Sequence, residues 1–259
     1  MIPKIIHYCW LSNDPLPEDF KKYMDGWKTV LSDYEFIKWD FNRFPKDKSA
    51  WVSEAFDHKK YAFAADYIRL YAVYHYGGIY MDMDMEVLKS FNDLLDKPYM
   101  FAKENKREDW IEAGCFGAEK NNEFIGKCLE RYEGRHFVKE DGSLDTVPLP
   151  IVLDGVRIAN KIKLKLYSWD YFTAKIYSSG EERPTNNTYT IHHFAGSWLN
   201  ESERRRLVRE RKICSIFGSY LGRNMFEFID AFQNGGFKKV KDLTIKKINH
   251  KIKKRINNN

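Results

Sequence analysis

Residues 61–88 read YAFAADYIRLYAVYHYGGIYMDMDMEVL, in which a helical pattern leads directly into a short apolar run. Its first part is rich in strong helix formers with apolar faces, and the helical pattern extends back to residue 54. The pair Gly77-Gly78 then stops the helix, because glycine is the usual residue just past a helix end. Residues 79–81 are a short apolar run typical of a buried strand. The stretch therefore predicts a helix over residues 54–76 that is followed directly by a strand.

The same alternation of helix and strand continues on both sides of this stretch. Apolar, β-branched and aromatic runs predict strands at residues 2–10, 34–39, 99–102, 111–118 and 189–194. Helical patterns cover residues 18–31, 123–132 and 201–232, and a glycine pair at 235–236 follows the last of them. Strands that alternate with helices are typical of an α/β fold, in which helices flank a central sheet.

Composition excludes several classes of protein. Of 259 residues, 43% are hydrophobic and 16% are aromatic, which is enough to build a core and excludes overall disorder. No run approaches the roughly 18 consecutive apolar residues of a membrane-spanning helix, and the first residues do not resemble a signal peptide. The four cysteines show no C-x-x-C spacing, which argues against a zinc ribbon, and reduced cysteines fit a cytoplasmic protein.

Positive charge is concentrated at the end of the chain. Residues 237–259 hold nine Lys or Arg and one acid, whereas the other 236 residues hold 34 basic and 36 acidic side chains. A nearly neutral body argues against nucleic-acid binding, because such proteins carry positive charge on the folded face. Isoleucines at 245, 248, 252 and 256 line one helical stripe between lysines. That pattern is typical of a helix on an anionic membrane surface; the alternative is a solvated, frayed tail.

Asp82 and Asp84 are the first candidates for chemistry. Two carboxylates at a strand end can hold a divalent cation against a diphosphate, where the metal stabilises the leaving group. In an extended segment both carboxylates would point to one side, and the methionines at 81, 83 and 85 would point to the apolar side. In open α/β sheets, ligands bind at the carboxyl ends of strands. The alternative is a solvated strand end that binds nothing.

Asp66 and Arg69 are the second candidates, because residues three apart on a helix are neighbours on its surface. Their helix face also carries Ala62, Val73 and Tyr76, so we expect the pair to be partly buried. One interpretation is an ordinary helical ion pair, which contributes roughly a few tenths of a kcal/mol. The other is a guanidinium that binds phosphate oxygens beside a metal ion.

The segment IHHFAGSW at residues 191–198 and the side chain of Trp10 supply the remaining candidates. Only one of His192 and His193 can face a given site if the segment is a strand. An imidazole added to carboxylates suits Mn²⁺, although a hydrogen-bonded core histidine is the alternative. Trp10 follows the first predicted strand, where its indole either stacks on a nucleobase or packs in the core.

Three segments in this order resemble glycosyltransferase family 32: IPKIIHYCW at residues 2–10, the stretch at 61–88, and IHHFAGSW. This is the DXD sugar-binding region family, and the likeness is to bacterial capsular and O-antigen polysaccharide transferases. It implies a GT-A fold, in which a Rossmann-like nucleotide-binding sheet is flanked by helices, here with a helical C-terminal extension. The expected domains are a GT-A domain at 1–200, helices packed on it at 201–236, and a basic amphipathic tail at 237–259.

The resemblance implies roles for the metal-binding residues. A divalent cation, Mn²⁺ or Mg²⁺, would be ligated by Asp84 directly and by Asp82 directly or through water, and Asp82 would also touch the ribose. His193 would be the third ligand, because it lies three residues before the glycine of H-F-x-G, and His192 is the alternative. Asp82 and Asp84 are thus the expected catalytic residues, and the sequence names no residue as the nucleophile.

The resemblance also implies a donor site. The chain departs from the family pattern at residues 112–114, which read Glu-Ala-Gly where relatives often read Asn-Ala-Gly. Glu112 is therefore a weaker candidate for contact with the sugar. The expected donor-binding residues are Trp10 against the base, Asp66, Arg69 and Asp82 at the sugar and phosphates, and Ser197 and Trp198 over the diphosphate.

The implied function is that of a retaining, metal-dependent glycosyltransferase that moves a hexose from a nucleotide-sugar to a glycan acceptor in surface polysaccharide biosynthesis. A UDP-sugar is favoured over GDP-mannose. The acceptor is expected to be lipid-linked, and the protein to be peripheral at the inner face of the plasma membrane. Two alternatives stay open: a metal-dependent phosphoesterase that uses Asp82 and Asp84, and a non-enzymatic adaptor that binds the membrane surface through its tail.

Overall fold

The structure is a computed structural model that describes residues 1–12, 14–106, 110–196 and 199–256, with side chains described up to residue 246. The chain divides into two compact units. Unit 1 comprises residues 1–175 and 182–198, and unit 2 comprises residues 176–181 and 199–259. Within the described part of the chain, no helix combines the length and the apolar character needed to cross a bilayer.

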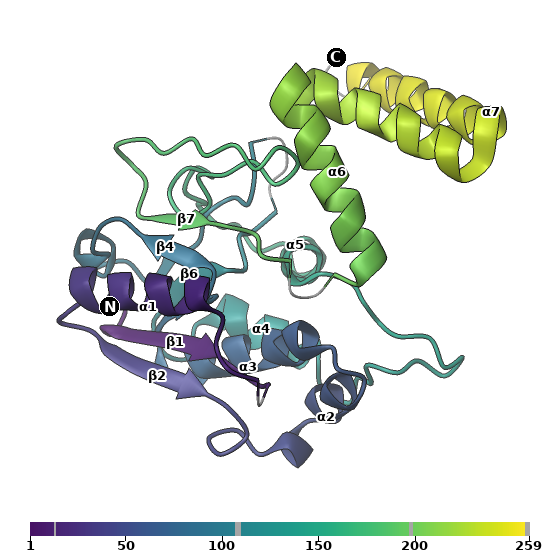
Figure 1. The fold of residues 1–259 in the computed structure, drawn as a ribbon. Helices are drawn as coiled ribbons and strands as arrows, with labels where there is room; N and C mark the ends of the chain where they lie inside the picture. Colours follow the sequence, from purple (N-terminus) through teal and green to yellow (C-terminus); the bar gives the residue numbers. More distant parts are fainter. Residues whose placement is uncertain (13, 107–109, 197–198, 257–259) are drawn as a thin grey trace. The chain divides into compact units, whose positions relative to one another are not determined.

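Unit 1 is built on a mixed five-stranded sheet and a smaller two-stranded sheet (Figure 1). The strands are β1 (Ile5–Cys9), β2 (Glu35–Trp39), β3 (Gly78–Met81), β4 (Met85–Val87), β5 (Tyr99–Met100), β6 (Cys115–Ala118) and β7 (Thr190–His192). In the large sheet β1 lies between β2 and β3 and runs parallel to both, whereas β6 runs antiparallel to β3 and β5. The small sheet pairs β4 with β7 in antiparallel fashion.

Helices cover the large sheet and bury two apolar clusters. They are α1 (Glu18–Val30), α2 (Ala50–Asp57), α3 (Tyr61–Tyr76), α4 (Glu123–Glu130) and α5 (Leu149–Ala159), with short 3₁₀ helices η1 (Lys46–Lys48) and η2 (Asn92–Leu94). Side chains alternate along a strand, so Tyr80 of β3 joins the cluster shared with α2 to α5. Ile79 and Met81 join the other cluster, which includes Trp27 of α1. The predicted α/β fold, in which helices flank a central sheet, is confirmed.

The helix predicted over residues 54–76 is instead two helices, α2 and α3. The chain leaves α2 through Lys59, whose φ of 57° is left-handed, and the Lys60 N–H donates to the Ala55 carbonyl across the break. This bond satisfies a carbonyl that the helix end would otherwise leave unpaired. At its other end α3 does stop at Gly77, as predicted, with φ 67°. An added Cβ there would lie 2.9 Å from the ring of Pro3.

The segment from Asp82 to Met85 is a turn rather than the predicted extended strand. The Met85 N–H donates to the Asp82 carbonyl at 3.1 Å, and the chain bends between β3 and β4. The methionines at 81, 83 and 85 are all buried, as predicted. The two aspartates of the DXD motif therefore come together through a turn and not through the side-chain alternation of one strand.

Unit 2 is helical. α6 (Glu201–Phe217) starts with a capping box, in which Asn200 and Glu203 accept from each other's backbone N–H groups. Gly218, with φ 76°, separates it from α7 (Ser219–Ile256), which bends at Gly235 and Gly236 (Figure 1). The helix predicted over residues 201–232 is therefore two helices. Helical geometry is interrupted at Gly235 and Gly236, where the sequence predicts a helix end, and a further helical segment follows within α7. The domain boundaries expected at residues 200 and 236 stay predictions.

Candidate metal centre and donor site

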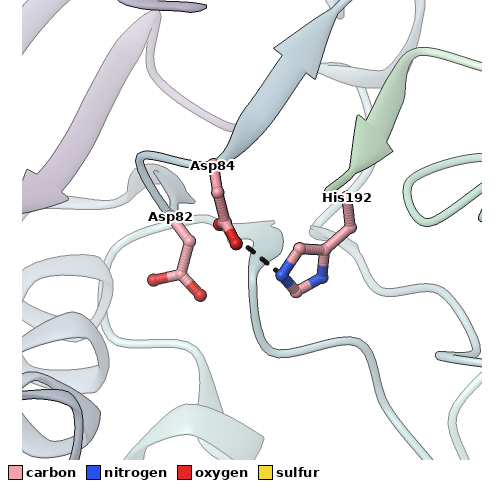
Figure 2. Close-up of side chains that lie close together, drawn as sticks. All are labelled: Asp82, Asp84 and His192. Carbon is pink, nitrogen blue, oxygen red and sulfur yellow. Dashed lines mark ion pairs between the residues drawn. The ribbon is translucent and has the colours of Figure 1, made fainter. Parts of the chain in front are cut away.

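Asp82, Asp84 and His192 come together just beyond the end of β3 (Figure 2). One carboxylate oxygen from each aspartate and one imidazole nitrogen lie within 4.8 Å of one another. His192 ends β7 and pairs with Met85 at the start of β4, so the β4–β7 pairing brings the late histidine to the early aspartates. Within the described ranges, this is the group of acidic, His or Cys side chains with a geometry that could hold a metal ion.

Both oxygens of the Asp82 carboxylate are held in place. Arg69 Nη1 donates to Oδ2 at 3.2 Å, and the Tyr80 hydroxyl donates to Oδ1 at 2.8 Å. The backbone N–H of Asp82 also donates to the Gly114 carbonyl at 2.7 Å. Burial raises the pKa of this carboxyl, although the positive charge of Arg69 opposes the shift. The carboxylate is therefore fixed at the strand end by the protein itself.

Arg69 links α3 to this site and is itself buried. Besides Asp82, it contacts the Ala113 carbonyl through Nη1 at 2.8 Å and the Asp66 carboxylate through Nη2 at 3.2 Å. Its guanidinium lies over the Tyr80 ring, 4.6 Å from the centroid. Burial raises the pKa of Asp66 to about 7, while the charge of Arg69 pulls it down. The pair therefore belongs to a buried network that reaches the DXD motif and is more than an isolated helical ion pair.

Asp84 is held in its ionised form. Burial alone would raise its pKa, but the charge of His192 and several hydrogen bonds outweigh burial and lower the pKa to about 2. Its Oδ2 accepts from the Ala195 N–H at 2.7 Å, and its Oδ1 lies 3.6 Å from His192 Nε2. A buried carboxylate that keeps its charge is well suited to bind a cation.

Glu112 orients the ring of His192. Its Oε1 lies 3.2 Å from His192 Nδ1 and accepts from the Gly114 N–H at 2.6 Å, while its Oε2 accepts from the Thr173 hydroxyl at 2.6 Å. Burial would lower the pKa of His192, but the carboxylates of Glu112 and Asp84 outweigh it and place the pKa well above the usual range. An added Cβ on Gly114 would lie 2.8 Å from His192 Cε1, so glycine makes room for the ring.

His193, the metal ligand that the resemblance implied, lies in a different group of side chains. Its ring stacks on Tyr23 of α1, with centroids 4.6 Å apart. Nε2 lies 2.9 Å from a Glu86 carboxylate oxygen, and Nδ1 lies 3.1 Å from Lys175 Nζ. The geometry therefore favours His192, which the sequence left as the alternative, over His193 as the third ligand.

Trp10 lies at the same sheet edge as Asp82, because β1 and β3 are adjacent and parallel. Its indole N–H donates to the Asp14 carbonyl at 3.0 Å, and its ring meets Phe20 edge-on with centroids 6.2 Å apart. The side chain is partly buried, and its contact with a base stays a prediction. Ser197 and Trp198 lie outside the described residues.

The site also contains groups that the sequence did not single out, namely the hydroxyls of Tyr80 and Thr173 and the N–H of Ala195. Tyr80 precedes Asp82 by two residues, and strand side chains at that spacing share a face, so this contact had a local signal. Thr173 contacts Glu112 across 61 residues of chain, and no local pattern indicates it. The sugar contact expected for Glu112 stays a prediction, while its observed contacts place it behind His192.

A protein-family model described as "Glycosyltransferase sugar-binding region containing DXD motif" matches residues 17–101. The matched range is about a third of the chain and contains Asp66, Arg69, Asp82 and Asp84. The resemblance seen in the sequence is confirmed over this range, in which the chain is similar to the DXD sugar-binding region of glycosyltransferases.

Similar curated proteins include two yeast enzymes and a viral protein. The mannosyl phosphorylinositol ceramide synthase SUR1 of Saccharomyces cerevisiae is 33% identical over 107 residues, which are 40% of this chain and 28% of that protein. The inositol phosphoceramide mannosyltransferase 2 of Schizosaccharomyces pombe is 36% identical over 104 residues, which are 38% of this chain and 29% of that protein. An uncharacterized glycosyltransferase of Acanthamoeba polyphaga mimivirus is 33% identical over 107 residues, 39% of this chain and 43% of that protein. The chain thus spans less than a third of the length of the two yeast relatives, whose names support a transferase enzyme.

Solved structures of glycosyltransferases are more distant. The PaToxG glycosyltransferase has a TM-score of 0.47 and 19% identity, over 61% of this chain and 70% of that chain. A glycosyltransferase involved in the glycosylation of the major capsid of PBCV-1 has a TM-score of 0.42 and 12% identity, over 79% of this chain and 98% of that chain. These likenesses are too distant to add to the description of the site.

Proposed function

We propose that this protein is a divalent-metal-dependent glycosyltransferase that moves a hexose from a nucleotide-sugar to a glycan acceptor with retention of configuration. The observation that carries the proposal is the convergence of Asp82, Asp84 and His192, whose ligand atoms lie within 4.8 Å of one another. The group lies at the carboxyl end of β3, beside the parallel strand β1. This is the edge at which open α/β sheets bind their ligands.

The three side chains fit a divalent cation. Two carboxylates and an imidazole are donors that Mn²⁺ accepts, and the carboxylates alone suit Mg²⁺. His192 Nδ1 contacts Glu112 at 3.2 Å, which leaves Nε2 on the side of Asp84. A metal-binding histidine usually has such a carboxylate partner on its second nitrogen. A divalent cation held there would act as a Lewis acid and stabilise the charge on the departing nucleotide diphosphate.

Different side chains of the site would bind the cation and position the donor. Asp84 and His192 would bind the cation directly, and Asp82 would bind it directly or through water. Arg69 balances the charges of the buried Asp66 carboxylate and the partly buried Asp82 carboxylate. We therefore assign Arg69 and Asp66 to positioning Asp82 as well as to the phosphate region of the donor.

The remaining donor contacts follow from position in the chain. Trp10, at the same sheet edge as Asp82, presents an aromatic ring for the nucleobase, and Ser197 and Trp198 would close over the diphosphate. No side chain is assigned as a nucleophile. Transfer would then proceed on one face of the sugar. Asp82 and Asp84 would contribute by holding the cation beside the leaving diphosphate.

We further propose a UDP-hexose as donor and a lipid-linked precursor of a surface polysaccharide as acceptor. The yeast relatives are named for mannosyl transfer to inositol phosphoceramide, so GDP-mannose is the second donor to test. A lipid-linked acceptor is supported by residues 237–259, which hold nine Lys or Arg and one acid. Each basic group near an anionic bilayer contributes about 1 kcal/mol. The tail would therefore hold the protein in the cytoplasm at the inner face of the plasma membrane.

Turnover of the purified protein with a panel of nucleotide-sugars tests the proposal. We expect release of nucleotide from a UDP- or GDP-sugar with Mn²⁺, loss of that release with a chelator, and recovery when Mn²⁺ or Mg²⁺ is restored. Hydrolysis of simple phosphate esters without sugar release would instead favour a metal-dependent phosphoesterase. Failure to bind any donor or metal would favour a non-enzymatic adaptor at the membrane surface.

A further inference from the structure

α7 carries a row of apolar side chains, all of which except the partly buried Met225 are exposed. Leu221, Met225, Phe228 and Phe232 are spaced four, three and four residues apart, so they share one face of the helix. Leu221 is 54% exposed and Phe232 is 50% exposed. Phe237, just after the bend, is 82% exposed, and its ring meets Phe232 edge-on with centroids 5.2 Å apart. These five residues are called the α7 stripe below.

Another face of α7 is already occupied by α6. Phe226 is buried, and the guanidinium of Arg206 lies over its ring, 5.0 Å from the centroid. Gly222 is so close to α6 that an added Cβ would lie 2.5 Å from the Cα of Cys214. The helix therefore uses one face to pair with α6 and presents the stripe on another. Exposed apolar side chains that gather on one helix face indicate contact with a partner.

The charge of unit 2 indicates the chemistry of that partner. Residues 176–181 and 199–259 hold 16 Lys or Arg and seven acids, a net charge of +9, whereas the rest of the chain holds 27 and 30, a net charge of −3. Four lysines follow the stripe directly, at positions 238, 239, 241 and 246. A second copy of the chain would bring two +9 units together, which charge repulsion opposes. The phosphates of a nucleic acid would pair with the lysines but would leave the apolar side chains of the α7 stripe exposed to water.

We propose that unit 2 docks on an anionic lipid bilayer through the α7 stripe. The stripe would enter the boundary between head groups and acyl chains, while the neighbouring lysines and arginines contact lipid phosphates. This assigns an apolar contact in residues 221–237, in addition to the electrostatic contact proposed for residues 237–259. The inference does not depend on the transfer chemistry.

Sedimentation of the full-length protein with vesicles of phosphatidylglycerol and phosphatidylcholine tests this inference. Salt screens contacts between exposed charges but not apolar contacts, so binding that persists at high salt reports the stripe. We expect the native protein to retain a bound fraction at high salt. The double substitution Phe228→Ser with Phe232→Ser should lower the vesicle partition coefficient there by about tenfold or more. Val208→Ser, which alters an exposed apolar residue of α6, should leave it unchanged.

Equal high-salt binding of the double variant and the native protein would overturn the inference. A native dimer that the double substitution dissociates would also overturn it, because the stripe would then belong to a second copy of the chain. A lower melting temperature with unchanged vesicle binding would show that the stripe packs within the protein. Asp84→Asn should remove turnover and leave vesicle binding intact, so failure of the catalytic proposal is distinguishable from failure of this one.

Discussion

Two groups of polar side chains meet at the end of β7, and each contains one of two adjacent histidines. His192 contacts Glu112, whose side chain is 1% exposed, whereas His193 contacts Glu86, whose side chain is 42% exposed. Glu112 also accepts from the Gly114 N–H and the Thr173 hydroxyl. A buried carboxylate must find all its donors in the protein, while an exposed one can use water.

This difference in burial indicates which of the two histidine rings is held in a fixed position. The ring of His192 is clamped between Glu112 and Asp84, and glycine at position 114 leaves room for it. The ring of His193 lies against Tyr23 and has no aspartate of the DXD motif among its contacts. The surroundings of a histidine, more than its place in a sequence motif, therefore indicate which one is available to a cation beside the two aspartates.

The largest effect should come from removing the charge of Asp84. Asp84→Asn keeps the side-chain volume and an oxygen for the Ala195 N–H, but it removes the ionised carboxylate that lies beside Asp82 and His192. We expect turnover to fall on the order of 10³-fold at saturating Mn²⁺, with an unchanged far-ultraviolet circular dichroism spectrum. Glu86→Gln, in the group around His193, is the matched control and should keep nearly native turnover. An equal loss of turnover in Asp84→Asn and Glu86→Gln would contradict the assignment of the cation to the group around His192.

A second contrast compares two Asp-x-x-Arg pairs on helices. Arg69 is buried and balances Asp66 and Asp82, whereas Arg157 pairs with Asp154 in a partly exposed position on α5. Arg69→Met leaves the buried carboxylate of Asp66 and the partly buried carboxylate of Asp82 without their partner. It should lower the free energy of unfolding by about 3–5 kcal/mol. Arg157→Met should cost about 1 kcal/mol or less. Urea denaturation measures both, and similar values would contradict the buried network.

A third histidine extends the comparison to one that is buried without a carboxylate. His7 Nε2 donates to the Gly77 carbonyl at 2.8 Å, and its Nδ1 accepts from the Trp39 indole N–H at 3.0 Å. Burial lowers the pKa of His7 to about 4. Between pH 6.5 and 4 the His7 side chain therefore binds a proton in the unfolded chain but not in the folded chain. About 3 kcal/mol of stability, present above pH 6.5, should be lost as the pH falls through this range.

Unfolding free energies measured from pH 7.5 to pH 4 check this prediction. His7→Gln removes the titrating group and should flatten the pH dependence over that interval. If the variant and the native protein lose stability in parallel, other groups dominate and the assignment of a neutral His7 is wrong.

A smaller effect should follow from Glu112→Gln, because this residue would act on the cation only through His192. The substitution keeps the side-chain volume and weakens the contact with His192 Nδ1, which lies 3.2 Å from the carboxylate. Loss of such a partner typically costs about 10–100-fold in metal affinity. Isothermal titration with Mn²⁺ measures the change, and Glu86→Gln again serves as control. Native affinity in Glu112→Gln would show that Glu112 supports the fold alone.

Local sequence predicted a large part of the fold and of the site. The helix end at Gly77 and the nearness of Asp66 to Arg69 follow from glycine chemistry and from helical spacing. These features depend on residues close together in the chain, so a single sequence carries their signal.

Other features depend on structure that no short pattern encodes. The break between α2 and α3 at Lys59 contains neither glycine nor proline, so no residue type in the sequence marks it. It is stabilised by the hydrogen bond from the Lys60 N–H to the Ala55 carbonyl. α5 was not predicted because prolines flank its start, although proline is well accommodated in the first turn of a helix. The choice between His192 and His193 depends on the register of β7 with β4 and on Glu112, 80 residues away.

Direct measurement of Mn²⁺ binding to His192→Ala and His193→Ala tests whether Asp82, Asp84 and His192 form the cation site. The bound fraction can be read from the electron paramagnetic resonance signal of free Mn²⁺, without donor, acceptor or turnover. We expect His192→Ala to weaken binding by about 100-fold or more, since it removes a ligand rather than its partner, and His193→Ala to bind Mn²⁺ nearly as the native protein does. A large loss in His193→Ala with native affinity in His192→Ala would contradict the account.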